Sequence, residues 1–275
     1  MGAEKTFTVR EASSTGNNAP ANTTIVRENS PVACEALSVE ERLRYARSLE
    51  IEEVGESGQR RLASASVLVA GLGGVGSAAA MYLVAAGVGR VGLADGDTVE
   101  VSNLQRQILY TTDDVGKSKS EVARESLFRL NSGVEMSTYG YIADEVSARR
   151  VIEKFDFVVV AVDGLETKLM FARACQEAKK PSSQAGICGF GGQVMTCIPE
   201  RGDEFSALFG KEGRQARSGR GSYSPACGVA GCIQASEAMK YLMGKTSLLV
   251  GKVLEFDLLE NRFETICLSS GSSRN

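Results

Sequence analysis

The chain contains no histidine and no tryptophan among its 275 residues. Without histidine, the protein cannot use a histidine general base, a Ser–His or Cys–His pair, or a metal site with imidazole ligands. Any chemistry must therefore depend on carboxylates, cations, backbone amides or a thiol.

Cysteine occurs seven times, but no two cysteines have the C-x-x-C spacing of a structural zinc site. An odd number of cysteines without a secretory signal is typical of a reducing compartment in which most thiols are buried. We therefore expect a cytoplasmic protein with no zinc site.

Neither sign of charge is in large excess, because the formal net charge is -3 and the pI is about 5.4. This balance gives no reason to expect a nucleic-acid partner. The uncharged segment 67–89 is long enough for a membrane helix, but most of its glycines cluster in one tight turn. We expect a strand, a turn and a buried helix here, and no membrane span.

The domain organisation follows from the point at which regular patterns begin. Residues 1–37 are rich in small and polar residues and have no sustained hydrophobic period, which predicts a disordered tail. Ser38 and Glu41 then have the spacing of a helix capping box. We therefore predict one folded domain over residues 38–275.

From Ser66 onward, strand patterns alternate with helical patterns. The predicted strands are 66–70, 90–94, 134–141, 157–162, 181–185 and 193–198, and the predicted helices are 74–86, 117–130, 145–154, 166–178 and 228–243. Two last strands, 252–258 and 262–268, predict a hairpin. The predicted fold class is α/β, with a Rossmann-like, mostly parallel sheet, flanking helices and a C-terminal antiparallel hairpin.

Residues 200–223 are rich in glycine and arginine. A segment of this kind inside a compact domain indicates a functional lid or crossover loop. A solvated loop without a function is the alternative.

Four glycines, Gly71, Gly73, Gly74 and Gly76, follow a predicted strand and open a predicted helix. This context is typical of a nucleotide-binding turn, in which phosphate approaches the backbone amides at a helix N-terminus. NAD(P), flavin and ATP users all share such a turn. The P-loop pattern G-x-x-x-x-G-K-[ST] is absent.

Asp95 and Asp97 come directly after the second predicted strand. A carboxylate at the position of Asp95 accepts hydrogen bonds from ribose hydroxyls in dinucleotide-binding folds, although an ordinary turn aspartate is the alternative. The nearby polar segment contains Asn103, Arg106 and Gln107, and Arg106 could hold a phosphate in fork geometry. A dehydrogenase does not need this segment, so the pattern favours an ATP-using enzyme.

Two further charged residues are candidates for the site. Lys119 lies near the start of a predicted helix, where its charge opposes the helix dipole, and Lys117 is the local rival for a phosphate-binding role. Asp163 lies at the carboxyl end of a buried strand and could bind the Mg²⁺ that accompanies ATP. A helix N-cap is the structural alternative for Asp163.

Several of these motifs occur together in the order found in one family. From Ser38 to about Leu268, the chain resembles the ThiF/MoeB/HesA family of adenylyltransferases, relatives of the ubiquitin-activating enzymes. The residues that carry the resemblance are Arg44-Tyr-Ala-Arg47, Gly71-Leu-Gly-Gly-Val-Gly76, Asp95-Gly-Asp-Thr-Val, Ser102-Asn-Leu-Gln-Arg-Gln107, Val115-Gly-Lys-Ser-Lys119 and the helix 228–240.

The resemblance implies ATP-dependent adenylation of the C-terminal Gly-Gly carboxylate of a small ubiquitin-fold sulfur carrier, with release of pyrophosphate. It implies a homodimer in which Arg47 reaches the partner's active site. It also implies that the hairpin and the 200–223 loop guide the carrier tail. By position, the ATP-contacting residues are Gly74, Asp95, Asn103, Arg106, Lys119 and Asp163.

The chain departs from the family pattern in its cysteines and next to Asp163. The two zinc-binding C-x-x-C pairs of many members are missing, and the loop thiol of many relatives aligns roughly with Arg217. Cys227 and Cys232 are the nearest thiols. Gly164 and Lys168 stand where the family often has Asn and Arg. Cys227 could be a displaced nucleophile or a buried thiol at the start of a helix. We therefore predict adenylation and make no claim of a thioester or persulfide step.

Two other functions remain open from the residues. A nicotinamide-dependent oxidoreductase would use the same glycine turn but leaves Lys119 and Asp163 without a role. A degenerate relative that binds a carrier without turnover would explain the missing cysteines.

Overall fold

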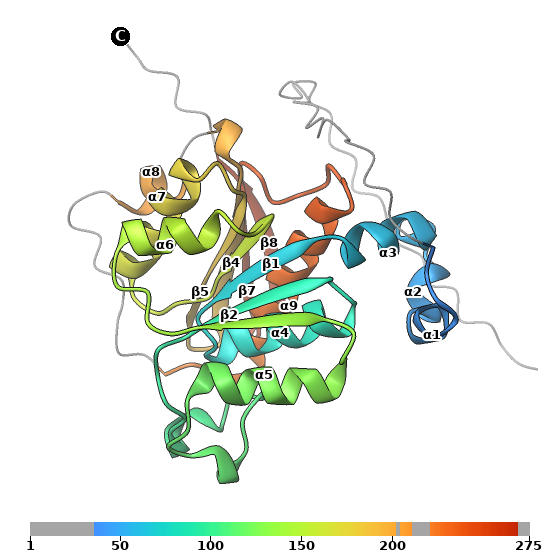
Figure 1. Ribbon diagram of the computed structural model, residues 1–275. Helices are drawn as coiled ribbons and strands as arrows, with labels where there is room; N and C mark the ends of the chain where they lie inside the picture. Colours follow the sequence, from blue (N-terminus) through green and yellow to red (C-terminus); the bar gives the residue numbers. More distant parts are fainter. Residues whose placement is uncertain (1–35, 202–203, 211–220, 269–275) are drawn as a thin grey trace, which may run out of the picture.

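The computed structural model describes residues 36–201, 204–210 and 221–268 (Figure 1). The tail expected over residues 1–37 lies outside the described residues except for its last two, of which Leu37 is buried.

One eight-stranded sheet runs through the molecule in the order β3-β2-β1-β4-β5-β6-β7-β8. The strands are β1 Ser66–Ala70, β2 Arg90–Ala94, β3 Glu135–Tyr139, β4 Phe157–Val160, β5 Ser182–Cys188, β6 Gly191–Cys197, β7 Lys252–Asp257 and β8 Arg262–Cys267. Strands β1 to β5 pair in parallel, whereas β6, β7 and β8 pair antiparallel. The predicted fold class is confirmed.

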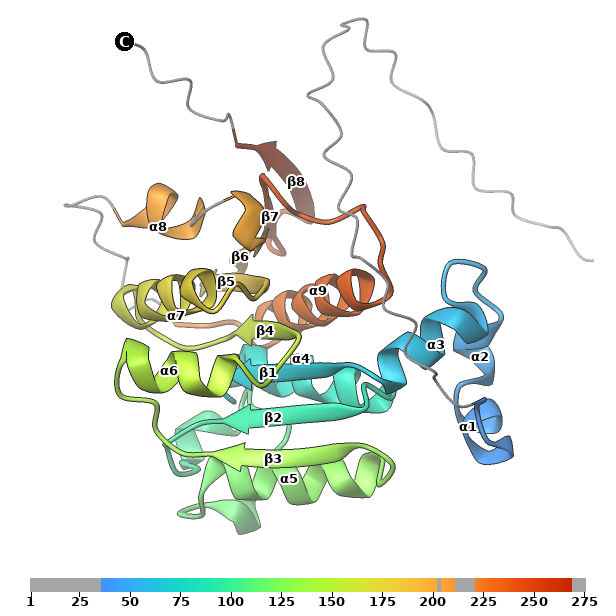
Figure 2. The same ribbon diagram turned by 45° about the horizontal axis from the view of Figure 1, so that its top comes forward.

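Helices cover both faces of this sheet (Figures 1 and 2). The helices are α1 Val39–Arg44, α2 Ala46–Leu49, α3 Gly55–Ala63, α4 Gly74–Ala85, α5 Lys119–Leu130, α6 Glu145–Ile152, α7 Leu165–Glu177, α8 Glu204–Phe209 and α9 Ser224–Leu242. Helices α4, α5 and α9 pack on one face, and α6, α7 and α8 pack on the other. Helices α1 and α2 lie to one side, away from β5 to β8.

The sheet centre is apolar on both faces, because each central strand is covered twice. Val67 and Val69 of β1 face the core under α4, whereas Leu68 faces the core under α6 and α7. Strands that are buried on both faces have continuous apolar sequences. Residues 66–70 and 157–160 show this pattern. Segment 67–89 forms β1, a turn and α4, as expected. Within the described residues, no helix has the length and apolar character needed to span a membrane.

Several predicted boundaries were wrong by a few residues. Helix α9 begins at Ser224 rather than at residue 228, because Pro225 is accommodated in the first helical turn. Strand β5 extends to Cys188 because it pairs with β6 over its whole length. Part of the segment predicted as a loop, residues 200–223, forms α8, whose Phe205 is buried against α7. Residues 202–203 and 211–220 of that segment lie outside the described residues.

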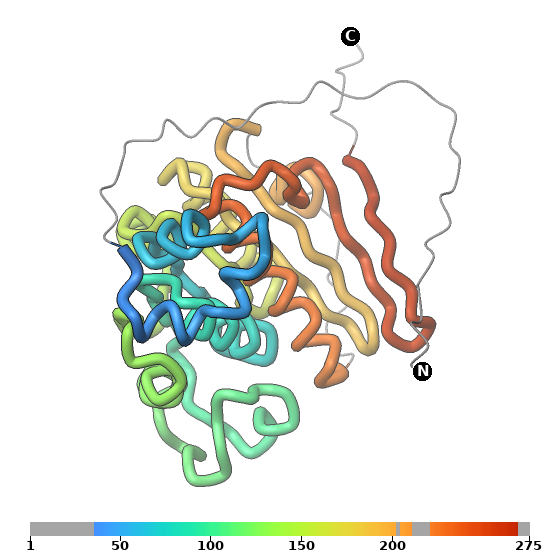
Figure 3. Tube along the Cα trace, turned by 90° about the vertical axis from the view of Figure 1, so that its right-hand side faces the viewer, coloured from blue at the N-terminus to red at the C-terminus, as the bar shows by residue number. Residues whose placement is uncertain are grey.

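The predicted capping box and hairpin are both present. The side chain of Ser38 accepts a hydrogen bond from the Glu41 amide, and the Glu41 carboxylate accepts one from the Ser38 amide. Strands β7 and β8 form the edge hairpin, drawn in red in Figure 3. Asn261 in its turn has φ of 51°, a left-handed conformation that asparagine tolerates better than most residues.

Candidate active site

A cavity of about 1190 Å³ opens at the carboxyl ends of the parallel strands. Its walls include the residues that follow β1, β2 and β4, namely Gly71, Asp95 and Asp163. The strand order reverses between β1 and β4, because β2 and β3 continue to one side of β1 and β5 to the other side of β4. Ligands of open α/β sheets bind at such a switch point.

The turn after β1 is held rigidly around Leu72. The Leu72 amide donates to Asp95 Oδ2 at 2.7 Å, and the Leu72 carbonyl accepts from the hydroxyl groups of Tyr110 and Ser77. Gly71 has φ of 88°, and a Cβ on Gly76 would lie 1.8 Å from the Gly71 carbonyl oxygen. Both positions therefore require glycine, one for its conformation and one for close packing.

Asp95 has a structural role in addition to its place on the cavity wall. One carboxylate oxygen accepts the Leu72 amide, and the other accepts the Asp97 amide at 2.9 Å. Asp95 therefore also acts as an ordinary turn aspartate, which was the structural alternative for this residue. Because each carboxylate oxygen has a further lone pair, Asp95 can still accept a hydrogen bond from a ligand hydroxyl.

Lys119, but not Lys117, lines the cavity. The Lys119 side chain is only 7% exposed, and its ammonium pairs with Asp97 Oδ2 at 2.9 Å. Lys117 pairs instead with Asp114 on the surface. Lys119 therefore presents a buried cation beside the glycine turn, with Asp97, which is 74% exposed, as its partner in the free protein.

Arg106 and Gln107 complete this side of the cavity. Arg106 Nη1 donates to the Ser102 carbonyl, and its Cγ would lie 3.1 Å from a Cβ placed on Gly74. Gln107 is 2% exposed, and its Oε1 atom has no hydrogen-bond partner within the described residues. A buried unpaired amide oxygen is costly unless a ligand or water satisfies it.

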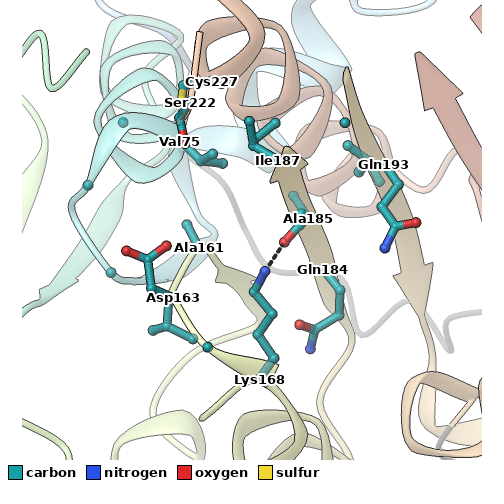
Figure 4. A pocket seen from close by; sticks show the side chains of 18 of the residues that line it. Val75, Ala161, Asp163, Lys168, Gln184, Ala185, Ile187, Gln193, Ser222 and Cys227 are labelled. Carbon is teal, nitrogen blue, oxygen red and sulfur yellow. Dashed lines mark hydrogen bonds between the residues drawn. The ribbon is translucent and has the colours of Figure 1, made fainter. Parts of the chain in front are cut away.

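Asp163 also lines the cavity, next to the end of β4 (Figure 4). The N-cap of α7 is Gly164, with φ of 78°, and no side chain caps this helix. No hydrogen bond or ion pair of the Asp163 carboxylate is found within the described residues. The N-cap alternative therefore does not describe Asp163, and its carboxylate is available to a ligand.

Three of the candidate residues do not line the cavity. Asn103 is buried in its own turn, where its Oδ1 accepts the Glu100 amide. Gly76 serves helix packing, as described above. Arg47 lies on α2, at the side of the molecule away from β5 (Figure 1), and its side chain is 91% exposed and paired with Glu50.

The two candidate thiols differ in position. Cys227 lies in the first turns of α9, is buried, and lines the cavity with its sulfur against the glycine turn. Burial raises the pKa of the Cys227 thiol, and the nearby Arg106 guanidinium only partly opposes this shift. Reactive cysteines are typically those with a lowered pKa, and the shift of Cys227 is in the other direction. Cys232 does not line the cavity, and burial raises its pKa as well. Arg217, which aligns with the family thiol, lies outside the described residues.

One wall of the cavity was not anticipated from the sequence. It contains Lys168 of α7, Gln184 and Gly186 of β5, and Gln193 of β6. The Lys168 ammonium donates to the Ala185 carbonyl at 2.6 Å, as Figure 4 shows. The signal available in the sequence was the polar Gln184 within the predicted strand 181–185.

These residues suit a nucleotide with its phosphates over the glycine turn. The turn provides amides at the N-terminus of α4, Lys119 and Arg106 provide charge, and the orphan Gln107 oxygen provides an acceptor. Asp163 is a hard oxygen ligand of the kind that Mg²⁺ prefers. The described residues hold no cluster of three metal-ligating side chains, so phosphate oxygens and water would have to complete the coordination of an ion at Asp163.

The fold and this cavity define a nucleotide-binding α/β protein of the Rossmann-like class. The chain belongs to the ThiF family, whose sequence profile matches residues 45–274.

Similar proteins are found by sequence and by structure. The chain is 40% identical over 238 residues to a sulfur carrier protein adenylyltransferase of Thermus thermophilus. This match covers 82% of this chain and 87% of the Thermus protein. It is 37% identical over 233 residues to the adenylyltransferase and sulfurtransferase MOCS3-1 of Zea mays, covering 83% of this chain but only 50% of the maize protein. The crystal structure of E. coli MccB with ATP has a TM-score of 0.71 at 25% identity, covering 84% of this chain and 73% of MccB.

Proposed function

We propose that the protein is an ATP-dependent adenylyltransferase that activates the C-terminal Gly-Gly carboxylate of a small ubiquitin-fold sulfur carrier. The observation that carries the proposal is one cavity in which Arg106, Lys119 and Asp163 surround the glycine turn. The names of the Thermus and maize relatives support it, and so does the ATP in the similar MccB structure. Residues 38–275 would form the adenylation domain.

In this reaction, an oxygen of the carrier carboxylate attacks the α-phosphorus of ATP. The new bond gives an acyl-adenylate, and the bond to the β-phosphate oxygen breaks to release pyrophosphate. A carboxylate is already ionised at neutral pH, so no general base is needed, in agreement with the absence of histidine. The protein must hold two anions together and neutralise phosphate charge, which is the role proposed for Arg106 and Lys119.

Asp163 would hold Mg²⁺ against the phosphates, and the ion would neutralise charge on the leaving pyrophosphate. Its carboxylate suits this role because no partner within the described residues competes for it. Asp95 would accept the ribose hydroxyls. Gly73 and Gly74 would let phosphate approach the backbone.

We also propose a homodimer in which Arg47 of one subunit serves the cavity of the other. Arg47 is exposed and does not line its own cavity, and helix α2, which carries it, lies to one side of the sheet (Figure 2). The proposed dimer would act in the cytoplasm, where the thiols stay reduced. The segment 200–223 and the β7–β8 hairpin would guide the carrier tail.

An oxidoreductase is disfavoured, because hydride transfer to a nicotinamide gives no role to the Lys119 cation and the free Asp163 carboxylate that line the cavity. A binding-only relative is disfavoured by the same residues, because they suit adenylyl transfer rather than docking.

The test is ATP–pyrophosphate exchange with Mg²⁺ and a panel of purified carriers that end in Gly-Gly. Exchange that requires one carrier and its intact tail supports the proposal and identifies the pathway. ATP binding without exchange for any carrier favours the binding-only function, and binding of NAD(H) in place of ATP favours the oxidoreductase.

A further inference from the structure

Helices α1 and α2 form an arm, residues 38–50, that carries Arg47 at one side of the sheet (Figure 2). Neither helix contains a buried residue. Of the described residues 38–50, only Tyr45 is buried, with 8% of its surface exposed. Tyr45 lies between the two helices, and its φ of -98° and ψ of 11° depart from helical values. The backbone at Tyr45 therefore sets the direction in which α2 and Arg47 leave α1.

The Tyr45 side chain is held at the end of α4 that lies away from the glycine turn. Its hydroxyl accepts a hydrogen bond from Asn131 Nδ2 at 3.0 Å, and the same nitrogen donates to the Val84 carbonyl at 2.9 Å. Asn131 is the C-cap of α5 and is 2% exposed. The hydroxyl thus joins the arm to the C-terminal ends of α4 and α5, in a buried place where hydrogen bonds are stronger than at the surface.

Gly87 shows how closely the tyrosine ring fits this place. A Cβ placed on Gly87 would lie 2.3 Å from the Tyr45 hydroxyl oxygen and 2.4 Å from its Cζ. Gly87 also has φ of 77°, a conformation that favours glycine by itself. The ring therefore occupies the space that α4 leaves open after its last turn, and packing fixes its position together with the hydrogen bond.

Two further side-chain links between the arm and the rest of the protein lie at the surface. Arg42 pairs with Glu56 of α3 at 2.8 Å, and both side chains are exposed. Arg44 Nη1 donates to the Leu130 carbonyl at 3.3 Å, again at an exposed position. Exposed ion pairs contribute little to holding a segment in one place. Tyr45 is therefore the buried anchor of the arm.

We propose that Tyr45 is a positioning residue for Arg47. Held against Asn131 and Gly87, Tyr45 keeps the arm in the orientation from which Arg47 reaches the cavity of the other subunit. This inference rests on the proposed function, in which Arg47 acts between subunits. A change at Tyr45 then impairs the cavity of the other subunit and leaves the cavity of its own subunit intact.

The alternative is that Tyr45 supports the cavity of its own subunit. Helix α4 connects the two places, because it begins at Gly74 of the glycine turn and ends beside Tyr45. A change at Tyr45 would then disturb the glycine turn through α4. The two roles give opposite results in mixed dimers.

The first experiment measures ATP–pyrophosphate exchange by mixed dimers with the carrier that supports exchange. Tyr45→Leu removes the hydroxyl and keeps an apolar group beside Gly87. Its homodimer should lose kcat by up to about 100-fold, because misplacing a group by about 1 Å can cost this much. Mixed with Arg106→Ala, it should regain activity, since the Tyr45→Leu subunit has an intact cavity and receives a well-placed Arg47. Mixed with Arg47→Ala, it should show no gain, because neither cavity receives a well-placed Arg47.

Two further variants separate positioning from folding. Tyr45→Phe removes only the hydroxyl, and Asn131 Nδ2 keeps the Val84 carbonyl as its acceptor, so the variant should fold. It should lower kcat by about 2- to 10-fold, the effect of one net hydrogen bond, with the same pattern in mixed dimers. Tyr139→Phe is the matched control and should keep the wild-type kcat. Its hydroxyl accepts from Ser137 at 3.5 Å on β3, and the residue does not line the cavity.

The second experiment follows amide hydrogen exchange in the full-length protein and does not depend on catalysis. Tyr45→Leu should exchange faster than the wild type over residues 46–50, because α2 loses its buried anchor. Amides of α4 should exchange as in the wild type.

The inference is overturned if Tyr45→Leu regains activity with Arg47→Ala, or with neither variant, since Tyr45 then supports its own cavity or the whole fold. It is also overturned if Tyr45→Leu keeps the wild-type kcat, if hydrogen exchange over residues 46–50 is unchanged, or if Arg47→Ala is fully active. Pyrophosphate exchange by the wild type alongside any of these results leaves adenylation in place. A wild type that shows no pyrophosphate exchange with any carrier rejects the proposed function, and the inference with it.

Discussion

The ammonium of Lys119 lies 2.9 Å from the Asp97 carboxylate and joins the first turn of α5 to the loop after β2. If Lys119 neutralises phosphate charge, Lys119→Met should lower kcat of pyrophosphate exchange by about 10²–10³-fold, as for the loss of one transition-state donor. Asp97→Asn removes only the partner that competes with phosphate and should cost much less. Equal losses in steady-state assays of the two variants would show that the ion pair, rather than the cation, matters.

Asp163 is expected to bind the metal ion and to contribute little to the stability of the fold. Asp163→Asn removes no hydrogen bond or ion pair found in the described part of the chain, so the free energy of unfolding should change by about 0.5 kcal/mol or less. Exchange should be lost at any Mg²⁺ concentration. Asp113→Asn, an exposed change outside the cavity, is the control and should remain active. Full activity of Asp163→Asn would remove Asp163 from the proposed site.

Arg47 and Arg106 provide a test for action between subunits. Arg47→Ala and Arg106→Ala should each abolish exchange, because both cations are proposed to contact phosphate. Dimers that contain one subunit of each variant would hold one intact cavity, so mixing should restore part of the activity. Activity that stays absent after verified subunit exchange would argue that Arg47 acts within its own subunit or not at all.

Cys227 is expected to be dispensable for adenylation. Burial raises the pKa of its thiol, and the proposed reaction forms no bond to sulfur. Cys227→Ala should retain most of the exchange activity. Cys227→Leu should instead block ATP, because the side chain lies against Gly74. Loss of exchange in Cys227→Ala with normal ATP binding would indicate a covalent step.

The sheet and the strand-end residues were predictable because they follow from simple rules. A continuous apolar run ends at Asp95 or Asp163, and the carboxyl ends of parallel strands lie at one edge. The glycine turn has a conformational requirement that is visible in the sequence as Gly71 and Gly76.

The cavity wall that contains Lys168 and Gln184 could not be predicted in the same way. Lys168 lies inside α7 and Gln184 inside β5, and their approach depends on how the helix packs on the sheet. In the sequence, Lys168 stood out only because the family often has Arg at this position. Helix α8 was missed because its few residues lie in a glycine-rich segment without a clear period.

The most direct measurement follows the label from ATP into the carrier. The protein is incubated with Mg²⁺, the carrier, and ATP labelled in its α-phosphate or in its γ-phosphate. We expect the carrier to acquire the α-label and not the γ-label, and a carrier without its terminal glycine to acquire neither. Transfer of the γ-label, or α-labelling that survives removal of the tail, would contradict attack by the terminal carboxylate on the α-phosphate.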